Sequence, residues 1–356
     1  MRASRYNLLL DGGTDGGAVL YNGLRGSLTS WDADEVATVR ALLADPMAGG
    51  DSLVRTLLVD QGNLIPDDVD ELEIVRSRRR AGVTDPNRLD VIIMPTLQCN
   101  FACTYCYEDP RGAAMTAETE AQLVAWLEAS IPRYRLVLLQ WFGGEPLLCS
   151  ETILRVTRAA QAAARNAETD VMVSPHVTTN GFLLDADLAR RFSAAGILDY
   201  QITLDGPPEV HDAMRPLRGG GPTFVQVFEG MLCALRSDER VTVAMRTNFN
   251  HTNIDRIPEL LDRVPAELRP RVRVVFEPVF GDCSVNATDN LLARDIVASL
   301  EQYKELARGA GYAVPASVDA LETGKLVYCY AEREHQVVIN ANGDVFKCSV
   351  CTFEPA

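Results

Sequence analysis

The sequence predicts an α/β protein whose largest part is a partial, TIM-like (β/α)6 barrel, and two observations support this. From residue 89 onward, short apolar segments alternate six times with longer helical patterns. The apolar segments are almost continuously hydrophobic, which is typical of parallel strands buried on both faces. A doubly wound parallel sheet is the other architecture that is consistent with this alternation.

The elements of this region follow one another regularly. The predicted strands cover residues 91–94, 136–142, 171–178, 200–204, 242–248 and 272–279. The helical patterns that follow them cover residues 116–130, 152–167, 185–195, 223–235, 253–264 and 289–310. Because helices lie between consecutive strands, the order predicts right-handed crossovers within one sheet. We expect this domain to span residues 89–312.

Residues 1–88 precede the alternation and have a different pattern. The apolar segments 6–10 and 18–21 flank a glycine-rich turn, which predicts a hairpin. Helical patterns follow from Asp32 or Asp34 to Leu43, over residues 52–59 and over residues 68–80. A hairpin with three short helices is consistent with a small winged-helix-like domain, and the polar residues 81–88 are expected to form a linker.

Composition narrows the class of partner. Of the 356 residues, 47% are hydrophobic, and 34 basic against 49 acidic side chains give a net charge of −15. This charge disfavours nucleic acid as a partner, because it repels a polyanion. The sequence contains neither an apolar stretch long enough to span a bilayer nor a signal-peptide pattern. We therefore expect a cytoplasmic protein without a membrane partner, acting on small molecules or peptides.

Three of the nine cysteines directly follow the first predicted strand of the alternating region. Cys99, Cys103 and Cys106 have the spacing C-x3-C-x2-C, at a strand end where α/β folds place functional loops. Iron–sulfur clusters usually take four cysteine ligands, so three leave one iron open to a small chelating ligand. The alternatives are three buried thiols or a zinc knuckle, which would need a fourth ligand; the nearest histidine in sequence is His176.

The segment of residues 97–107, Leu-Gln-Cys-Asn-Phe-Ala-Cys-Thr-Tyr-Cys-Tyr, resembles the cluster motif of the radical S-adenosylmethionine (SAM) superfamily, including the aromatic residue before the third cysteine. In that family the amino and carboxylate groups of SAM chelate the open iron. The resemblance therefore implies a [4Fe-4S] cluster on the three cysteines, SAM as the second cofactor, and a reductant such as flavodoxin or ferredoxin.

Two further motifs stand at the ends of the second and third predicted strands. Gly143, Gly144, Glu145 and Pro146 resemble the family's GGEP motif, whose backbone and glutamate position hold the SAM ammonium. Glycines let a backbone approach a ligand closely. Thr178 to Gly181 resembles T-x-N-G, in which polar groups such as those of Thr178 and Asn180 lie beside the SAM ribose and the substrate; alone, this segment would be a helix cap or a turn.

The fourth strand ends in Thr203-Leu204-Asp205-Gly206-Pro207, followed by His211-Asp212 and Arg215. This resembles the S-x-D-G-P…H-D-x-x-R pattern of the peptide- and protein-modifying branch, with a threonine for the serine. The resemblance assigns the SAM carboxylate to Thr203 and Arg215, since arginine binds carboxylates in a bidentate way. Arg246 on the fifth strand is a rival, and Asp205 and Glu277 are the candidate general bases.

The C-terminal region, residues 313–356, carries another cysteine pattern. Asn342-Gly343 predicts a hairpin turn between residues 337–339 and 345–346. Cys329 and Cys348 have the spacing C-x13-G-x4-C, which resembles the opening of the SPASM or twitch module. That module carries auxiliary iron–sulfur clusters, so the resemblance implies such a cluster on Cys329, Cys348 and Cys351. Cys283 is either a further ligand or a free thiol. We expect the module to be either truncated or smaller than the full SPASM module.

Together these motifs imply reductive cleavage of SAM and radical chemistry on an unreactive C–H bond. The leading substrate is a ribosomally made precursor peptide, whose leader would add as a strand to residues 1–88 and which would receive a thioether or carbon–carbon crosslink. An anaerobic sulfatase-maturing enzyme, which forms formylglycine, shares the motifs, but the long N-terminal region disfavours it. A non-catalytic iron–sulfur peptide-binding module is the alternative of another class, and the GGEP motif disfavours that.

Overall fold

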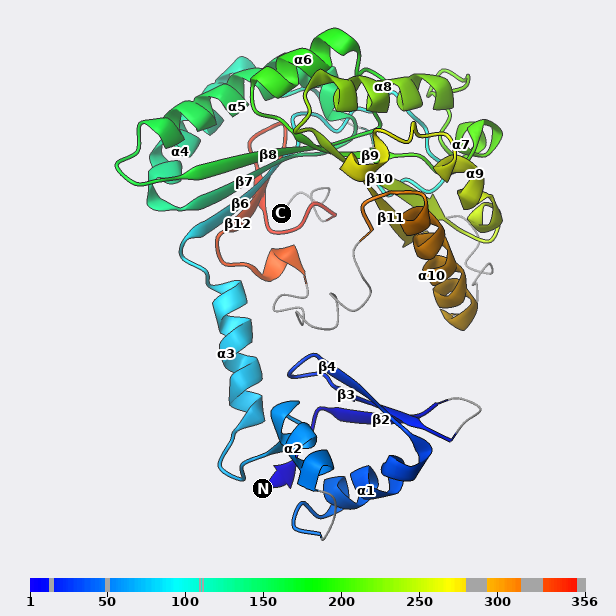
Figure 1. Cartoon of the computed structure of the whole chain (residues 1–356). Helices are drawn as coiled ribbons and strands as arrows, with labels where there is room; N and C mark the ends of the chain where they lie inside the picture. The colour runs from blue at the N-terminus through cyan, green and yellow to red at the C-terminus, as the bar shows by residue number, and fades with distance from the viewer. Residues whose placement is uncertain are drawn as a thin grey trace. The chain divides into compact units, whose positions relative to one another are not determined.

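The computed structural model describes residues 1–12, 16–48, 52–108, 110, 112–279, 293–314 and 329–350. The chain divides into two compact units (Figure 1). The first consists of Met1–Asp85 with Pro315–Arg333, and the second of Pro86–Val314 with Glu334–Ala356. Among the described residues, no helix has the length and hydrophobicity required to cross a bilayer.

The first unit contains a three-stranded antiparallel sheet. Its strands are β2 (Asn7–Asp11), β3 (Ala18–Asn22) and β4 (Ser27–Trp31), and β3 lies in the centre. The predicted hairpin is confirmed as β2 and β3, and β4 is an addition that the sequence analysis did not include. A second, short pairing joins β1 (Arg2–Ala3) to β5 (Leu64–Ile65).

Three α-helices lie among the described residues of this unit. They are α1 (Ala33–Ala44), α2 (Ser52–Asp60) and α3 (Glu71–Val83). Helix α1 begins after Asp32, whose backbone N–H donates to the Glu35 carboxylate at 3.1 Å. Helix α3 continues to Val83, so residues 81–83 of the predicted linker are helical. One core of buried side chains, which includes Leu20, Trp31, Val39, Leu42 and Leu58, joins the sheet to α1 and α2. The winged-helix assignment of this unit stays a prediction.

The second unit is built on an eight-stranded sheet with the order β11-β10-β9-β8-β7-β6-β12-β13. The strands that follow one another in chain order are parallel: β6 (Arg88–Ile93), β7 (Leu136–Trp141), β8 (Met172–Thr179), β9 (Asp199–Thr203), β10 (Thr242–Phe249) and β11 (Val272–Pro278). They confirm the six predicted strands. Because they are adjacent in chain order without a reversal, the sheet is consistent with a partial barrel and excludes the doubly wound alternative.

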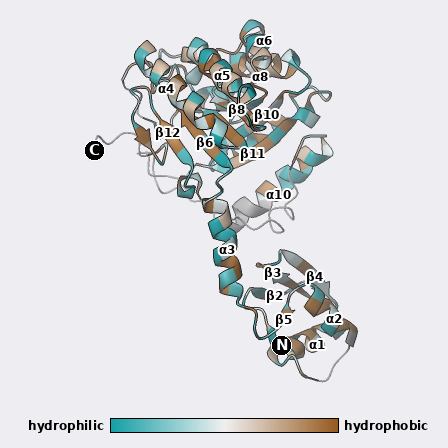
Figure 2. Cartoon of the chain, turned by 90° about the vertical axis from the view of Figure 1, so that its left-hand side faces the viewer, coloured by the Kyte–Doolittle hydropathy of each residue, from teal (hydrophilic) through white to brown (hydrophobic). Residues whose placement is uncertain are grey.

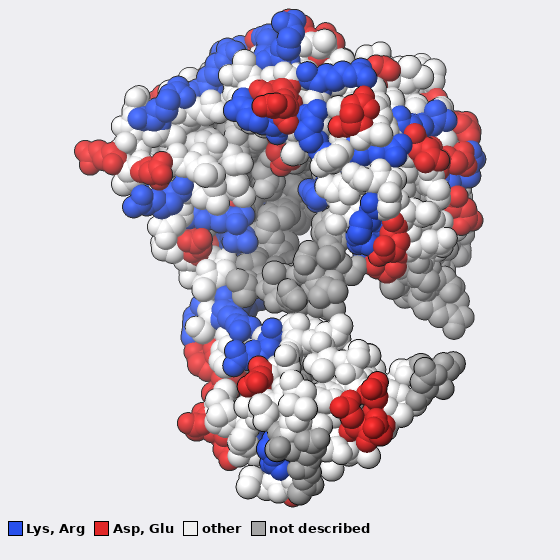
Figure 3. Space-filling model, in the orientation of Figure 1, with Lys and Arg blue, Asp and Glu red and all other residues white. Residues whose placement is uncertain are grey.

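The helices that follow these strands along the chain cover one face of the sheet (Figure 1). They include α4 (Ala117–Ser130), α5 (Ser150–Arg165), α6 (Ala186–Ala194), α8 (Phe224–Ser237), α9 (Ile257–Leu261) and α10 (Ala293–Gly309). Helix α9 is shorter than the predicted 253–264, because a 3-10 turn occupies Ile254–Arg256. An additional helix, α7 (Pro208–Met214), follows β9. Basic and acidic side chains are interspersed over the outer helical layer (Figure 3).

The strands are less uniformly buried than their sequences predict. In β7, Val137, Leu139 and Trp141 are fully buried against the helices, whereas the residues between them are only half-buried. The same alternation in β8 leaves His176 and Thr178 half-buried on the other face. The helices lie over strands that are rich in hydrophobic residues (Figure 2). On their other face, β7 and β8 carry half-buried side chains, among them the polar His176 and Thr178.

The C-terminal residues join the same sheet. The predicted hairpin is confirmed as β12 (Gln336–Ile339) and β13 (Val345–Phe346), with Gly343 in the turn at φ +89°. Strand β12 pairs in parallel with β6, so that Val337 lies beside Val91. This pairing was not predicted, and it places the hairpin at the edge of the barrel next to the strand that leads to Cys99.

Candidate functional site

The sequence motifs meet at one edge of the second unit's sheet. The three-cysteine segment follows β6, the Gly-Gly-Glu-Pro segment follows β7, and the segments around Asn180 and Asp205 follow β8 and β9. Because parallel strands present their carboxyl ends at the same edge, consecutive strands bring these loops together. We call residues 97–108, which carry the three cysteines, the cysteine loop.

None of the three loop cysteines forms a disulfide. Cys99 and Cys103 are half-buried, and burial raises the pKa of the Cys99 thiol to about 11. In the part of the chain that the structure describes, no three His, Cys, Asp or Glu side chains stand close enough to share a single metal ion.

The cysteine loop is paired with the segment that follows α7. The Ala102 N–H donates to the Pro216 carbonyl at 2.9 Å, and the Thr104 N–H donates to the Met214 carbonyl at 2.9 Å. Phe101 and Leu217 form an antiparallel bridge next to the first of these bonds, and on its other side the Arg218 N–H donates to the Asn100 carbonyl at 2.8 Å. Residues 100–104 are therefore held by backbone hydrogen bonds to residues 214–218.

The two glycines after β7 are required by their contact with the cysteine loop. Gly143 has a φ of +109°, which disfavours any other residue. A Cβ atom on Gly144 would lie 2.4 Å from the carbonyl oxygens of Leu97 and Gln98. The Glu145 N–H donates to the Gln98 carbonyl at 2.9 Å. The motif thus fixes the first residues of the cysteine loop against the end of β7.

Glu145 is fully buried, and its carboxylate is occupied by protein donors. It accepts hydrogen bonds from the Leu147 N–H at 2.9 Å, the Thr179 hydroxyl at 2.6 Å and the Asn180 N–H at 2.8 Å. Burial raises the pKa of Glu145, and the bonds from Thr179 and Asn180 oppose this. The side chain therefore ties the ends of β7 and β8 together, and Pro146 begins the turn that follows it.

The two predicted residues of the third motif point in different directions. The Asn180 side-chain amide donates to Asn100 Oδ1 of the cysteine loop at 2.8 Å. The Thr178 hydroxyl instead lies 3.2 Å from His176 Nε2, and His176 Nδ1 lies 3.0 Å from Asp199 Oδ2. Asn180 thus contacts the cysteine loop, whereas Thr178 lies on the inner face of the barrel.

The fourth motif forms a buried charged cluster. Asp205 is fully buried and accepts hydrogen bonds from the Asn248 N–H at 2.8 Å and from the Tyr105 hydroxyl. Arg215 Nη1 donates to the Tyr105 oxygen at 2.6 Å and lies 3.9 Å from Asp205 Oδ2. Burial raises the pKa of Asp205, and Arg215 opposes this. With both carboxylate oxygens engaged, Asp205 suits a structural role better than that of a general base.

The remaining candidates flank this cluster. Arg215 is buried, and its Nε atom has no hydrogen-bond partner among the described residues, so a bound anion would satisfy it. Thr203 and Arg246 are neighbours on β9 and β10, and Arg246 Nε donates to Asn248 Oδ1 at 2.8 Å. Glu277 is half-buried on β11 and pairs in register with Asn248.

The two described C-terminal cysteines belong to different units. Cys329 is exposed and belongs to the first unit, whereas Cys348 is half-buried and belongs to the second. Cys351 and Cys283 lie outside the described residues. Ligation of an auxiliary cluster by these residues stays a prediction.

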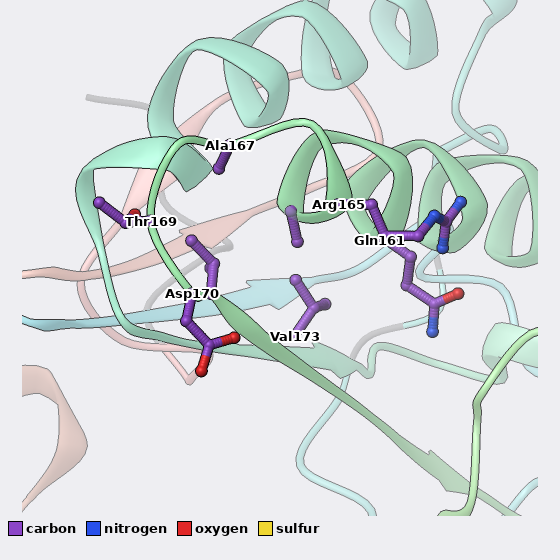
Figure 4. Close-up of a pocket in the computed structure, with 8 residues that line it drawn as sticks. Gln161, Arg165, Ala167, Thr169, Asp170 and Val173 are labelled. Atoms are coloured by element: carbon purple, nitrogen blue, oxygen red, sulfur yellow. The ribbon is translucent and has the colours of Figure 1, made fainter.

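A pocket of about 350 Å³ lies at the opposite end of the sheet, between the end of α5 and the start of β8 (Figure 4). Gln161, Arg165 and Asp170 are among its lining residues. Since Thr178 and Asn180 stand at the other end of β8, this pocket is not part of the candidate site.

Sequence reasoning missed several residues that build the site. Each of them forms a hydrogen bond that holds a motif residue in place: Asn100, Tyr105, Thr179, His211 and Asn248. His211 does so as the acceptor for the Asp205 N–H. For Asn100, Tyr105, Thr179 and His211 a signal existed, because all four lie within motifs that were recognised. No pattern in the sequence singles out Asn248.

Residues 93–264 match the family model described as "Radical SAM superfamily". A serine-type anaerobic sulfatase-maturating enzyme from Klebsiella aerogenes is 31% identical over 137 residues, 37% of this chain and 33% of that enzyme. The matches span between 33% and 41% of the lengths of the first curated relatives.

Two solved structures share the fold. The structure of anSMEcpe with bound AdoMet and Cp18Cys peptide is 18% identical, with a TM-score of 0.57 over 75% of each chain. Streptococcus suis SuiB bound to precursor peptide SuiA is 14% identical, with a TM-score of 0.51 over 98% of this chain and 83% of that one.

Proposed function

Since this chain contains a radical SAM domain, whose family uses a [4Fe-4S] cluster and SAM, we propose that it is a peptide maturase of the oxidoreductase type. It modifies a ribosomally made precursor peptide and forms a thioether or carbon–carbon crosslink within it. The observation that carries the proposal is the convergence of the cysteine loop with three motif loops at the carboxyl ends of β6 to β9.

The residues at this edge suit both cofactors. Cys99, Cys103 and Cys106 would hold the cluster, and the raised pKa of Cys99 means that its thiol must lose a proton on binding. Arg215, with its unsatisfied and buried Nε, is the donor best suited to the SAM carboxylate. Thr203 adds a hydroxyl nearby, and the backbone of the Gly-Gly-Glu-Pro segment is proposed to hold the ammonium.

The bound cofactors supply a 5′-deoxyadenosyl radical that removes a hydrogen atom from the substrate. The electron that starts this reaction is proposed to come from flavodoxin or ferredoxin. The chain's own part is to position the groups and, where the product requires it, to accept a proton. Glu277 is the better candidate for this base, because it is half-buried on the inner face of β11, whereas Asp205 is fully engaged.

The first unit is proposed to recognise the leader of the precursor. Strands β2 and β4 form the two edges of its sheet, and within the described residues neither pairs with a further strand. Leu8, Tyr21 and Leu28 form one row across the sheet, and about half of the Leu8 and Leu28 side chains is exposed. An extended peptide can add to such an edge through main-chain hydrogen bonds and cover the apolar row. The likeness to SuiB, which extends over 98% of the chain, supports this proposal.

Replacing Leu28 by lysine tests peptide recognition. The peptide would be one encoded by a short reading frame beside the gene, labelled for fluorescence anisotropy. Losing an apolar contact should weaken binding about tenfold or more, while 5′-deoxyadenosine formation without peptide is retained. Val345→Lys, an exposed hydrophobic position in the second unit, is the matched control. Equal affinities of the two variants would contradict recognition by this sheet.

A sulfatase-maturing activity is the second candidate, favoured by the 31% identity to the Klebsiella enzyme. Both activities cleave SAM, so only the peptide product separates them. Incubation with a sulfatase-derived peptide, followed by mass spectrometry, would reveal formylglycine if this candidate is right.

A further inference from the structure

We propose that Tyr105 is a positioning residue: its hydroxyl fixes the cysteine loop to the barrel and orients Arg215 toward the ligand. The first part concerns the protein without cofactors, and the second rests on the proposed function. Tyr105 stands between Cys103 and Cys106, so a constraint on its side chain constrains both cysteines.

The Tyr105 hydroxyl has three partners on three different segments. It donates to Asp205 Oδ2 after β9, and it accepts from Arg215 Nη1 at 2.6 Å and from Asn248 Nδ2 of β10 at 3.0 Å. A phenolic hydroxyl has one hydrogen and two lone pairs, so these bonds use its whole capacity. No partner can be exchanged without the loss of an existing bond.

The hydroxyl also separates two buried charges. Asp205 is fully buried, Arg215 is nearly so, and their closest atoms are 3.9 Å apart. Phenylalanine at position 105 would remove the group between them and allow a direct ion pair. The barrel would then retain its charge balance, while the cysteine loop would lose its side-chain attachment.

Arg215 links this network to the backbone pairing of the loop. It lies within residues 214–218, which hold residues 100–104, and its own N–H donates to the His211 carbonyl at 2.8 Å. Its Nη1 is bound to Tyr105, whereas its Nε is unsatisfied among the described residues. The Tyr105 bond therefore sets the direction in which the guanidinium presents its remaining donors.

The test compares Tyr105→Phe with Tyr200→Phe in the full chain without cofactors. Tyr200 is the matched control because it is fully buried on the same sheet and its hydroxyl makes one bond, to the Ile197 carbonyl at 3.3 Å. Amide hydrogen exchange, read by mass spectrometry, is measured over residues 99–108. Tyr105→Phe should speed exchange of this segment about tenfold, because three hydrogen bonds to the loop are lost. Tyr200→Phe should leave it unchanged, and an unchanged rate in Tyr105→Phe would overturn the proposal.

A second measurement addresses Arg215. After anaerobic reconstitution, SAM affinity is measured by equilibrium dialysis and by the change that SAM causes in the electron paramagnetic resonance spectrum of the reduced cluster. Tyr105→Phe should bind SAM about fivefold or more weakly, since one hydrogen bond no longer orients the guanidinium. Wild-type affinity in this variant would refute the role in orienting Arg215. If the wild-type chain itself binds no SAM, the proposed function fails, while the exchange measurement still decides the role in the loop.

Discussion

Replacing Gly144 by alanine should destabilise the second unit and disturb the cysteine loop. The added Cβ would lie 2.4 Å from the carbonyl oxygens of Leu97 and Gln98 and 2.7 Å from the Gln98 carbonyl carbon. An ordinary contact begins near 3.4 Å, so these backbone atoms would have to move by about 1 Å. Because they belong to the main chain, no side-chain rotation can relieve the overlap.

The loss of stability can be estimated from substitutions that insert extra atoms into a well-packed interior, which lower the free energy of unfolding by about 1–3 kcal/mol. We expect a value near the upper end, since two carbonyl groups are displaced at once. The measurement is urea unfolding of the cofactor-free protein, in which a loss of about 2–3 kcal/mol lowers the midpoint by roughly 1 M. Reconstituted Gly144→Ala should also bind less iron, because the displaced residues lead directly to Cys99.

Gly219→Ala is the matched control, because a Cβ at that position has no neighbour within 4 Å. It makes the same chemical change in an open loop of the same unit. If Gly144→Ala has the urea midpoint and the iron content of Gly219→Ala, the close approach of these two loops does not constrain the protein, and the reasoning is refuted.

Three further predictions follow from the site. Replacing the three cysteines of the loop by alanine should abolish 5′-deoxyadenosine formation with dithionite and SAM, and iron retained by the folded variant would indicate the auxiliary cluster. Arg215→Lys should weaken SAM binding about tenfold and more than Arg246→Lys, because, of these two arginines, Arg215 is the one with a buried donor that lacks a partner among the described residues. The opposite order in equilibrium dialysis would favour Arg246. Burial alone would raise the pKa of Asp199, but the hydrogen bond with His176 holds this pKa below the usual value. The ionised carboxylate therefore stabilises the fold above about pH 4, and this contribution is lost as the pH falls through the lowered pKa. Asp199→Asn should therefore lower the free energy of unfolding at pH 7, measured by urea unfolding, by less than about 1 kcal/mol, since half of the side chain is exposed. A difference that does not shrink on acidification would contradict this.

The parallel strands of the barrel could be predicted because their apolar residues are nearly continuous. Strand β4 could not, since Leu28 and Trp31 are its only large hydrophobic residues and polar residues occupy the other positions. Helix α7 was hidden because Pro207 and Pro208 indicate a turn, although proline is also well tolerated in the first turn of a helix. The pairing of β12 with β6 joins residues 336–339 to residues 90–93, and no local pattern predicts such a contact.

The candidate site was predictable as a set of loops but not as a set of contacts. The order of the motifs along the chain indicated which strand ends would meet. It did not indicate that the Glu145 carboxylate faces Thr179 and the Asn180 N–H. It also did not indicate that Tyr105 joins Asp205 to Arg215. Which side chain turns inward depends on the packing of neighbouring strands, and a single sequence does not contain that information.

The pairing of β12 with β6 has a consequence for how the protein is made. Strand β6 carries the cysteine loop, yet its outer edge is completed only by Gln336–Ile339, which the ribosome delivers some 240 residues later. At 5–20 residues per second this takes roughly 12–50 s, during which the nascent barrel exposes an unpaired apolar strand. Until β12 pairs with it, the open edge of β6 can pair with a strand of another chain, so slow synthesis of the intervening residues prolongs the period in which aggregation competes with folding.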